Sequence, residues 1–302
     1  MKKCLLLGAS GFLGTALCQK LSSNYKLVAF DKYFHTSFPT SENINCVCGD
    51  FLTYDEFDRL LDGVETVIHL ISTTIPTEGT VNIYREVEEN ILPTIRLLEA
   101  VGQSNVKQFI FASSAGTVYG ETREYINTIN SPLNPKSTYG LQKTLIESII
   151  RFYSQQYNFK YQIMRISNPY GAGQSSEKQQ GVIPILIRKL FSNEPVTVYG
   201  TTPTRNYIYM DDLLYAFECV LSYKGDVSCF NICTRDNISL PELLNLIEKE
   251  SNRQFEKIIY EDTRSFDVVH SFLQYEDSQA ELGWYPVTSL RDGIHKILHF
   301  YN

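Results

Sequence analysis

Two residues capable of acid–base chemistry, Tyr139 and Lys143, stand four positions apart near the middle of the sequence. They open an amphipathic stretch to about Tyr157 that predicts a helix, so both side chains lie on one face, with Cβ atoms about 6 Å apart. A free tyrosine titrates near ~10, and an ammonium group about 4 Å away is expected to lower that pKa by about three units. The phenol can then exchange a proton with a sugar or alcohol hydroxyl. The alternative is an exposed tyrosine and lysine on an ordinary helix.

Hydroxyl side chains gather just before this helix. Residues 106–114 predict a strand that ends in Ser113 and Ser114, and Thr117 follows. In open α/β sheets the chemistry lies at the carboxyl ends of the strands, so we expect an active-site edge here. This placement favours the catalytic interpretation of Tyr139 and Lys143.

A glycine-rich turn lies at the start of the chain. Residues 4–7 predict a buried strand, Gly8, Gly11 and Gly14 follow at three-residue spacing, and residues 15–21 predict a helix. Such a turn presents free N–H groups and the positive end of a helix to a diphosphate, and side chains would block that approach. The alternative is a tight turn without a ligand.

An acidic residue, Asp31, ends the second predicted strand at residues 26–30. An acid about 20 residues beyond the glycines can accept both ribose hydroxyls of an adenosine and repels a 2′-phosphate. This favours NAD over NADP, although the neighbouring Lys32 weakens the argument. The alternative is an aspartate that caps a turn.

The order of predicted elements indicates the fold. Strands at 45–48 and 66–72 continue the β-α-β pattern of a doubly wound parallel sheet, and His69 is interpreted as a core residue. Residues 86–102 predict a helix that Pro93 bends, with Asn90 able to reach the cofactor side. A later helix at 240–252 has Ser239 as its N-cap and Pro241 in its first turn. We therefore predict a Rossmann-type sheet with a smaller, mixed α/β C-terminal substrate domain.

Composition excludes several classes of protein. A net charge of −7 argues against nucleic acid as a partner. No apolar run approaches 20 residues and no polybasic stretch is present, so we expect no membrane contact, and the early strand leaves no room for a signal peptide. The seven cysteines are scattered and odd in number, which predicts a cytoplasmic protein, and their spacing predicts no metal site.

Together these motifs resemble, in type and order, those of the extended short-chain dehydrogenase/reductases, and most closely the UDP-glucose 4-epimerase branch of the NAD-dependent nucleotide-sugar epimerases and dehydratases. The resemblance covers essentially the whole chain. The motifs that carry it are Gly8-x-x-Gly11-x-x-Gly14, Asp31, Gly49-Asp50-Phe51, Ser113-Ser114, Val118-Tyr119-Gly120, Tyr139-x-x-x-Lys143, Arg165-x-x-Asn168-Pro169-Tyr170-Gly171, Arg205-x-Tyr207-x-Tyr209-x-Asp211-Asp212 and Leu282-Gly283-Trp284.

The resemblance implies NAD as the cofactor, a UDP-sugar as the substrate and a homodimer built from two helices of each subunit. It implies an NAD-binding domain at 1–168, to which 207–233 returns, and a substrate domain at 169–206 and 234–302. The residues implied to bind the cofactor are Gly8, Gly11, Phe12, Leu13, Gly14, Asp31, Asp50, Phe51, Leu70, Asn90, Ser113, Tyr139 and Lys143. Those implied to bind the nucleotide-sugar diphosphate are Asn168, Arg205 and Arg264, although a surface salt bridge is the alternative for each arginine.

The sequence departs from the family pattern at three points. The catalytic Ser or Thr of the family is Ala115 here, and alternation along an extended strand would make Thr117 its substitute, with Ser114 second. The Asp-Glu pair of the dehydratases is replaced by Gly116 and Thr117, which argues against dehydration. The aspartate that usually follows the phosphate-binding arginine is Asn206, which is expected to loosen that loop.

Three functions follow from the resemblance. The first is NAD-dependent epimerisation at C4 of a UDP-hexose or UDP-N-acetylhexosamine through a 4-keto intermediate, in surface-polysaccharide or galactose metabolism, with Tyr139, Lys143 and Thr117 as catalytic residues. The second is an NAD(P)H-dependent reductase of a 4-keto nucleotide sugar. The third, supported by Ala115 alone, is a catalytically spent nucleotide-binding protein.

Overall fold

The computed structural model describes residues 1–74, 82–122, 126–174, 181–264 and 268–300. By their contacts the residues of the chain form two compact units. The first unit comprises Met1–Ser114, Ser137–Arg165 and Asp226–Cys229, and the second comprises Ala115–Lys136, Ile166–Gly225 and Phe230–Asn302. These units differ from the predicted domain limits, which place residues 115–136 with the cofactor-binding part.

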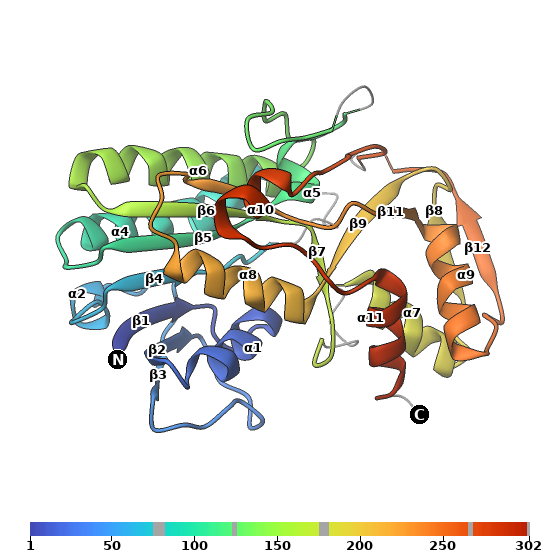
Figure 1. Ribbon diagram of the computed structural model, residues 1–302, viewed down its shortest axis with the longest axis horizontal. Coiled ribbons are helices and arrows are strands. Elements are labelled where there is room, and N and C mark those ends of the chain that lie inside the picture. The colour runs from blue at the N-terminus through green and yellow to red at the C-terminus, as the bar shows by residue number, and fades with distance from the viewer. Residues whose placement is uncertain (75–81, 123–125, 175–180, 265–267, 301–302) are drawn as a thin grey trace. The chain divides into compact units, whose positions relative to one another are not determined.

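A seven-stranded parallel sheet with the order β10-β6-β5-β4-β1-β2-β3 confirms the predicted Rossmann-type architecture (Figure 1). Its strands are β1 (Lys2–Leu7), β2 (Tyr25–Asp31), β3 (Ile44–Cys48), β4 (Thr66–His69), β5 (Gln108–Ser114), β6 (Lys160–Ile166) and β10 (Cys229–Ile232). The chain leaves the sheet at β3 and re-enters it on the other side of β1, as β4. This reversal is the point where open α/β sheets bind their ligands.

Helices of the first unit bury the apolar sheet residues. They are α1 (Phe12–Leu21), α2 (Phe57–Leu60), α3 (Ile83–Glu86), the π-helical η1 (Val87–Ile91), α4 (Leu92–Gly102) and α6 (Thr138–Tyr157). Figure 1 shows α4 and α6 lying side by side, and the two helices are in contact. Leu97 of α4, Ile146 of α6 and Phe109 of β5 belong to one buried cluster. The continuous apolar strands are thus explained by burial on both faces.

The predicted bend near Pro93 takes the form of a π-helical turn. Helical structure begins at Ile83, earlier than predicted, and η1 lies directly before the α4 turn that contains Pro93. Proline lacks the N–H that a regular α-helix would use there, and a wider turn is one way to accommodate it. Glu86, directly before η1, and Asn90, within it, are both buried.

The second unit contains two small sheets. Its strands are β7 (Asn168–Tyr170), β8 (Val196–Tyr199), β9 (Thr204–Tyr209), β11 (Asn237–Ser239) and β12 (Ile258–Glu261), arranged as β11-β9-β7 and β12-β8. Its helices are α5 (Ala115–Val118), α7 (Val182–Phe191), α8 (Met210–Ser222), α9 (Leu240–Ser251), α10 (Glu276–Leu282) and α11 (Leu290–Leu298). The predicted start of α9 is confirmed, because Ser239 caps it and forms a capping box with Glu242.

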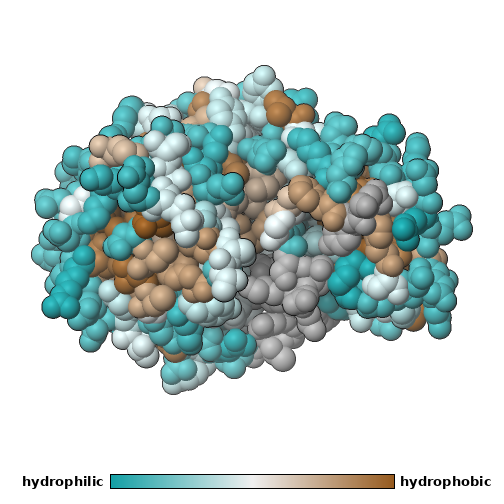
Figure 2. All heavy atoms as spheres, turned by 90° about the horizontal axis from the view of Figure 1, so that it is seen from below, coloured by the Kyte–Doolittle hydropathy of each residue, from teal (hydrophilic) through white to brown (hydrophobic). Residues whose placement is uncertain are grey.

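The surface is mostly polar on the face drawn in Figure 2, where hydrophilic residues predominate and hydrophobic atoms gather in separate patches. Scattered exposed apolar side chains are normal in folded proteins. Within the described part of the chain, no helix combines the length and the apolar character that crossing a membrane requires.

Candidate active site

The glycine turn between β1 and α1 can be built only with glycine at two of its positions. Gly8 has a φ of +86°, and a Cβ atom on Gly14 would lie 2.1 Å from the carbonyl oxygen of Gly8. The N–H groups of Gly8 and Ala9 both donate to Phe30 O, at 3.0 and 3.1 Å, which ties the turn to the end of β2. The turn therefore has the shape of a phosphate-binding loop.

Helix α1 begins immediately after this turn. Its N-cap residue is Gly11, which has no side chain to accept a hydrogen bond. The N–H groups of the first helical residues, Phe12 and Leu13, therefore have no side-chain cap. A helix of this length presents a partial positive charge at its N-terminus, which suits an anion such as a diphosphate. The sequence-predicted phosphate-binding residues are thus contiguous in space as well as in sequence.

Asp31 at the end of β2 is held against the glycine turn. Its carboxylate accepts hydrogen bonds from Ser10 N at 2.8 Å and from Lys32 N at 2.7 Å. The Lys32 ammonium group forms an exposed ion pair with Asp50 at 2.7 Å, and this hydrogen bond lowers the pKa of the Asp50 carboxyl. The Lys32 side chain is thus paired with Asp50. Its positive charge therefore no longer weakens the preference for NAD over NADP. Phe51, the predicted adenine-binding neighbour, is buried.

Two further predicted cofactor residues lie after β4 and on η1. Leu70 N donates to Leu7 O at 3.0 Å, which extends the pairing of β4 with β1. The Asn90 side chain accepts from Thr73 N at 3.0 Å and donates to Thr73 Oγ1 at 2.9 Å and to Glu86 Oε2 at 3.1 Å. Asn90 therefore holds Thr73, four residues after the end of β4.

The predicted pair on α6 is brought to the end of β5. Ser137 caps the helix by accepting from Gly140 N at 3.1 Å. Lys143 Nζ donates to Ala112 O at 3.0 Å and lies 5.6 Å from the centre of the Tyr139 ring. The Ser114 side chain forms a hydrogen bond with the phenol. Tyr139, Lys143 and Ser114 therefore form one cluster at the carboxyl end of β5.

The electrostatics of this cluster add contributions that oppose the expected lowering of the Tyr139 pKa by Lys143. Burial raises the pKa of the phenol, the charge of Glu86 raises it further, and the hydrogen bond from Ser114 only partly offsets both. Burial also lowers the pKa of the Lys143 ammonium group to about 8, against the opposing charges of Glu147 and Glu86. The expectation counted the charges of Lys143 and of a nicotinamide cation and left out desolvation and the carboxylates.

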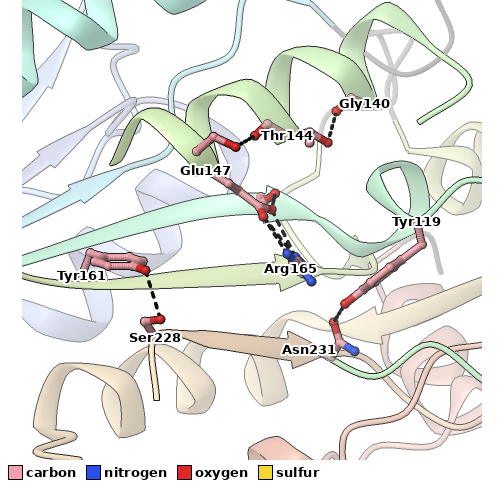
Figure 3. Close-up of polar contacts among 10 residues, drawn as sticks. Tyr119, Gly140, Thr144, Glu147, Tyr161, Arg165, Ser228 and Asn231 are labelled. Carbon is pink, nitrogen blue, oxygen red and sulfur yellow. Dashed lines mark hydrogen bonds and ion pairs between the residues drawn. The ribbon is translucent and has the colours of Figure 1, made fainter. Parts of the chain in front are cut away.

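The carboxylate of Glu147 is part of a buried ion pair. Figure 3 shows Arg165 of β6 pointing at Glu147 of α6, and the Arg165 Nη2 and Glu147 Oε2 atoms are 2.8 Å apart. Ser113 donates to the same carboxylate at 2.5 Å. The predicted cofactor residue Ser113 is thus engaged in this network.

The reasoning that placed Thr117 ahead of Ser114 is wrong in its geometry. Strand β5 ends at Ser114, and Ala115–Val118 is a helical turn, so alternation along an extended strand does not apply. Thr117 belongs to the second unit, and within the described chain its buried Oγ1 has no hydrogen-bond partner. Ser114 is the hydroxyl that contacts the phenol.

Two of the predicted substrate residues line one small cavity in the second unit. The cavity has a volume of about 10 Å³, and Asn168 and Arg205 are in its wall. Arg205 donates to Thr204 O at 2.9 Å and to Val268 O at 2.6 Å. Asn168 Nδ2 donates to Asn206 O at 2.7 Å.

Asn206 does not loosen its loop, contrary to expectation. Its amide group donates to Thr234 O at 2.7 Å and to Asp236 O at 2.8 Å, and it accepts from Thr234 N at 3.0 Å. A neutral amide, which both donates and accepts, ties β9 to the loop between β10 and β11.

Arg264 lines a different cavity of the second unit. This cavity has a volume of about 830 Å³, and the guanidinium carbon of Arg264 lies 4.9 Å from the centre of the Tyr199 ring. The structure therefore places Arg205 and Arg264 in the walls of two separate cavities, whereas the resemblance implied one shared diphosphate site.

Sequence reasoning missed two carboxylates near the Tyr139 and Lys143 pair. Glu147 follows Lys143 by one helical turn, so the spacing alone would have identified it. Glu86 lies on another element, 53 positions before Tyr139 in the sequence, and no local pattern signals it.

Comparison with known proteins identifies the family. A model of the NAD dependent epimerase/dehydratase family matches residues 4–233. The chain is 34% identical to a dTDP-4-dehydro-6-deoxyglucose reductase of Escherichia coli over 97% of this chain and 96% of that protein. It is 26% identical to a UDP-glucose 4-epimerase of Mycolicibacterium smegmatis over 99% and 98% of the two chains.

A solved structure agrees with these relatives. The UDP-glucose 4-epimerase of Thermotoga maritima, crystallised with UDP-glucose, has a TM-score of 0.89 and 28% identity, over 99% of this chain and 98% of that one. The seven-stranded parallel sheet agrees with these matches. The chain therefore belongs to the NAD dependent epimerase/dehydratase family, whose members are NAD-dependent enzymes of nucleotide-sugar chemistry.

Proposed function

We propose that this protein epimerises C4 of a UDP-hexose or a UDP-N-acetylhexosamine. The observation that carries the proposal is the cluster of Tyr139, Lys143 and Ser114 at the end of β5, in a chain with a TM-score of 0.89 to a UDP-glucose 4-epimerase. Bound NAD supplies a site that accepts a hydride from the sugar and returns it, so that no net oxidation occurs. Surface-polysaccharide or galactose metabolism would use such a reaction.

In this proposal Tyr139 moves the proton of the sugar 4-hydroxyl group. Burial and Glu86 raise the pKa of the phenol, so the charges of Lys143 and of a bound nicotinamide ring would be needed to stabilise the phenolate that accepts this proton. The same phenol would return the proton to the keto oxygen. Lys143, fixed by Ala112 O, supplies the positive charge, and Ser114 orients the phenol. The 4-keto sugar turns over and is reduced on its other face, which inverts C4.

The first unit is proposed to hold the cofactor. A Cβ atom on Gly14 would clash with the backbone of Gly8, so the turn and α1 pack this closely only with glycine there, and the N-terminus of α1 would suit a negative ligand. The Asp31 carboxylate would accept the adenosine ribose hydroxyls. The other residues proposed to contact NAD are Gly8, Gly11, Phe12, Leu13, Asp50, Phe51, Leu70, Asn90, Ser113, Tyr139 and Lys143.

The second unit is proposed to hold the nucleotide sugar. Asn168 and Arg205 line one cavity and Arg264 lines another, larger one. Guanidinium groups suit a diphosphate because their donors are forked, so we propose that both arginines bind charged parts of the substrate.

A reductase of a 4-keto nucleotide sugar is a second candidate. The observation that favours it is the 34% identity to the Escherichia coli dTDP-4-dehydro-6-deoxyglucose reductase. The two functions differ in stoichiometry, because a reductase consumes one reduced cofactor for each sugar.

We also propose that the protein is a cytoplasmic homodimer. Its seven cysteines are free, as a reducing compartment predicts. Leu92 of α4 and Leu145 and Phe152 of α6 are exposed apolar side chains on two helices that contact each other. A second copy that packs against these helices would bury them.

The experiment that tests the proposed function follows nucleotide sugars by NMR with catalytic enzyme and no added reductant. Interconversion of UDP-glucose and UDP-galactose, or of their N-acetyl forms, supports the epimerase. Turnover of a 4-keto sugar with stoichiometric NADH oxidation, and no interconversion, supports the reductase. Ser114→Ala and Thr117→Val form a matched pair, and we expect the first to reduce kcat more.

A further inference from the structure

Two exposed cysteines, Cys46 and Cys48, lie on β3, and neither the family motifs nor the proposed mechanism uses them. Strand β3 forms one edge of the seven-stranded sheet, next to β2 (Figure 1). Side chains alternate between the two faces of a strand, so residues two positions apart point to the same face. We call these two thiols, which share one face of an edge strand, the thiol pair.

The pKa values of the thiols in this region agree with that placement. Burial raises the pKa of the Cys46 thiol, and the charge of Cys48 raises it further, as expected for two thiols that lie close together. Cys18 of α1 is buried, and burial, followed by the charge of Cys46, raises its pKa to about 12. The thiolate is the reactive form of cysteine, so Cys18 is inert near neutral pH. Among these three cysteines, accessible thiol chemistry belongs to the thiol pair.

Cys48 is next to a residue of the candidate cofactor site. In the parallel pairing of β2 with β3, Asp31 is the partner of Cys48 and Ala29 is the partner of Cys46. Paired residues of adjacent strands point to the same face of the sheet, so Cys48 and Asp31 are neighbours on that face. The Asp31 carboxylate in turn accepts a hydrogen bond from Ser10 N of the glycine turn at 2.8 Å. The thiol pair therefore borders the carboxylate proposed to bind the adenosine ribose.

The backbone that follows Cys48 also belongs to this end of the sheet. Gly49 N donates a hydrogen bond to Asp31 O at 3.0 Å, which continues the pairing of β2 with β3. Asp50, the next residue, forms the ion pair with Lys32. A change in the backbone at Cys48 would therefore act directly on Asp31 and Asp50, two residues proposed to contact NAD.

A disulfide within the thiol pair would cause such a change. Residues two positions apart in an extended strand have Cα atoms about 6.6 Å apart. Disulfides most often join Cα atoms about 5.5–6 Å apart, so closing this bridge would shorten β3 and strain the bond. In the sheet order, as far as the chain is described, β3 has β2 as its single neighbour, so the shortening would disturb one ladder.

A metal site is the alternative use of two neighbouring thiols. Structural zinc sites almost always use four protein ligands. Within the described ranges, no group of three or more histidine, cysteine, aspartate or glutamate side chains is arranged to hold a metal ion. The geometry of the thiol pair therefore favours chemistry between the two sulfur atoms.

We propose that Cys46 and Cys48 form a modification site, a dithiol that closes reversibly to a disulfide and thereby weakens the binding of NAD. This inference goes beyond the proposed epimerisation, and it rests on the proposed role of Asp31 as a ligand of the adenosine ribose. Disulfides of proteins in a reducing compartment are usually transient and often sense the redox state.

The reaction is an exchange with a small-molecule disulfide, which is the oxidant. One thiolate of the thiol pair attacks a sulfur atom of that disulfide, which forms a mixed disulfide and releases one small thiol. The second thiolate attacks the protein sulfur of the mixed disulfide and releases the other small thiol. Two protein thiols are thus oxidised, the small disulfide is reduced to two thiols, and the two protons of the protein thiols end on the released thiols.

The test treats the full chain with excess oxidised glutathione and measures two quantities. Mass spectrometry of the peptide that contains both cysteines should find it two hydrogens lighter, without bound glutathione. In Cys46→Ser, which lacks the second thiol, the same peptide should keep a glutathione adduct on Cys48. Calorimetry should show that the dissociation constant of NAD rises by about tenfold or more in the oxidised parent protein and returns to its first value after reduction with dithiothreitol.

Two variants show whether the thiol pair is the source of the change. The double variant Cys46→Ser, Cys48→Ser keeps two small polar side chains but cannot form the bridge, so the treatment should leave its NAD affinity unchanged. Cys219→Ser removes a cysteine of α8, in the second unit, and should lose NAD affinity on oxidation as the parent protein does.

The proposal is overturned if the parent protein forms no disulfide between Cys46 and Cys48, or if the disulfide forms and the NAD affinity stays the same. An equal loss of affinity in the double variant would also overturn it. Neither readout needs a nucleotide sugar. A failure of the proposed function would appear separately, as an absence of nucleotide-sugar turnover by the reduced protein.

Discussion

The ammonium group of Lys143 donates a hydrogen bond to the carbonyl oxygen of Ala112, 3.0 Å away, so the backbone of β5 fixes the cation of the candidate site. This contact gives Lys143 a defined place one helical turn from Tyr139. Burial in that place lowers the lysine pKa to about 8, within the range where an enzyme assay can detect it.

The pKa of Lys143 predicts an alkaline loss of activity. The ammonium group is charged below pH 8 and loses its proton as the pH rises through about 8. If the reaction needs the cation, kcat/KM should decline by about tenfold per pH unit above that value. Lys143→Arg keeps its charge at any such pH, so whatever activity it retains should not show this decline. A pH profile of both proteins makes the comparison, and an unchanged decline in the arginine variant would exclude Lys143 as its source.

The buried ion pair of Glu147 with Arg165 predicts a large stability effect. Glu147→Leu leaves the Arg165 guanidinium group buried without its carboxylate, which should cost about 3–5 kcal/mol of the free energy of unfolding. Glu56→Leu breaks the exposed pair with Arg59 and should have a much smaller effect. Urea denaturation of the two variants measures the difference. Equal, small losses of unfolding free energy in the two variants would show that the buried pair of Glu147 and Arg165 stabilises the fold no more than the exposed pair does.

The buried side chain of His69 predicts that the folded protein loses stability in acid. It is buried between Phe51 and Phe111, and its Nε2 atom contacts Thr94 Oγ1 at 3.0 Å. Burial lowers its pKa from 6.5 to about 3, so between these values the unfolded chain binds more protons than the folded one. Stability is therefore lost as the pH falls below 6.5, by about 3 kcal/mol at pH 4.5 from this group alone.

The matching variant is His69→Gln, which is neutral at every pH and keeps a donor for Thr94. The difference in unfolding free energy between parent and variant should shrink or change sign from pH 7 to pH 4.5. A difference that stays constant with pH would mean that His69 does not titrate on unfolding.

Most of the fold could be predicted from local signals. The alternation of short apolar strands with helices, the glycine turn and the Ser239 cap are each coded within a few neighbouring residues, and the sheet order and the start of α9 confirm them. The end of β5 could not be predicted, because Ala115–Val118 turns into a helix where alternation had implied a strand.

The electrostatics of the site were the least predictable part. The spacing of Tyr139 and Lys143 indicated that they meet, but the pKa of each depends on burial and on Glu86, which reaches them through tertiary packing. Likewise, Asn206 was expected to loosen a loop. Only its hydrogen bond with Thr234, 28 positions away, shows that its side chain holds a loop in place.

The most direct test of the account compares the parent protein with Tyr139→Phe in the NMR assay of UDP-glucose and its C4 epimer. The account predicts that the variant folds and still binds NAD but loses more than about 10²-fold in kcat, the usual scale for a general acid–base group. Turnover by the variant within a few-fold of the parent would contradict the central role of the phenol.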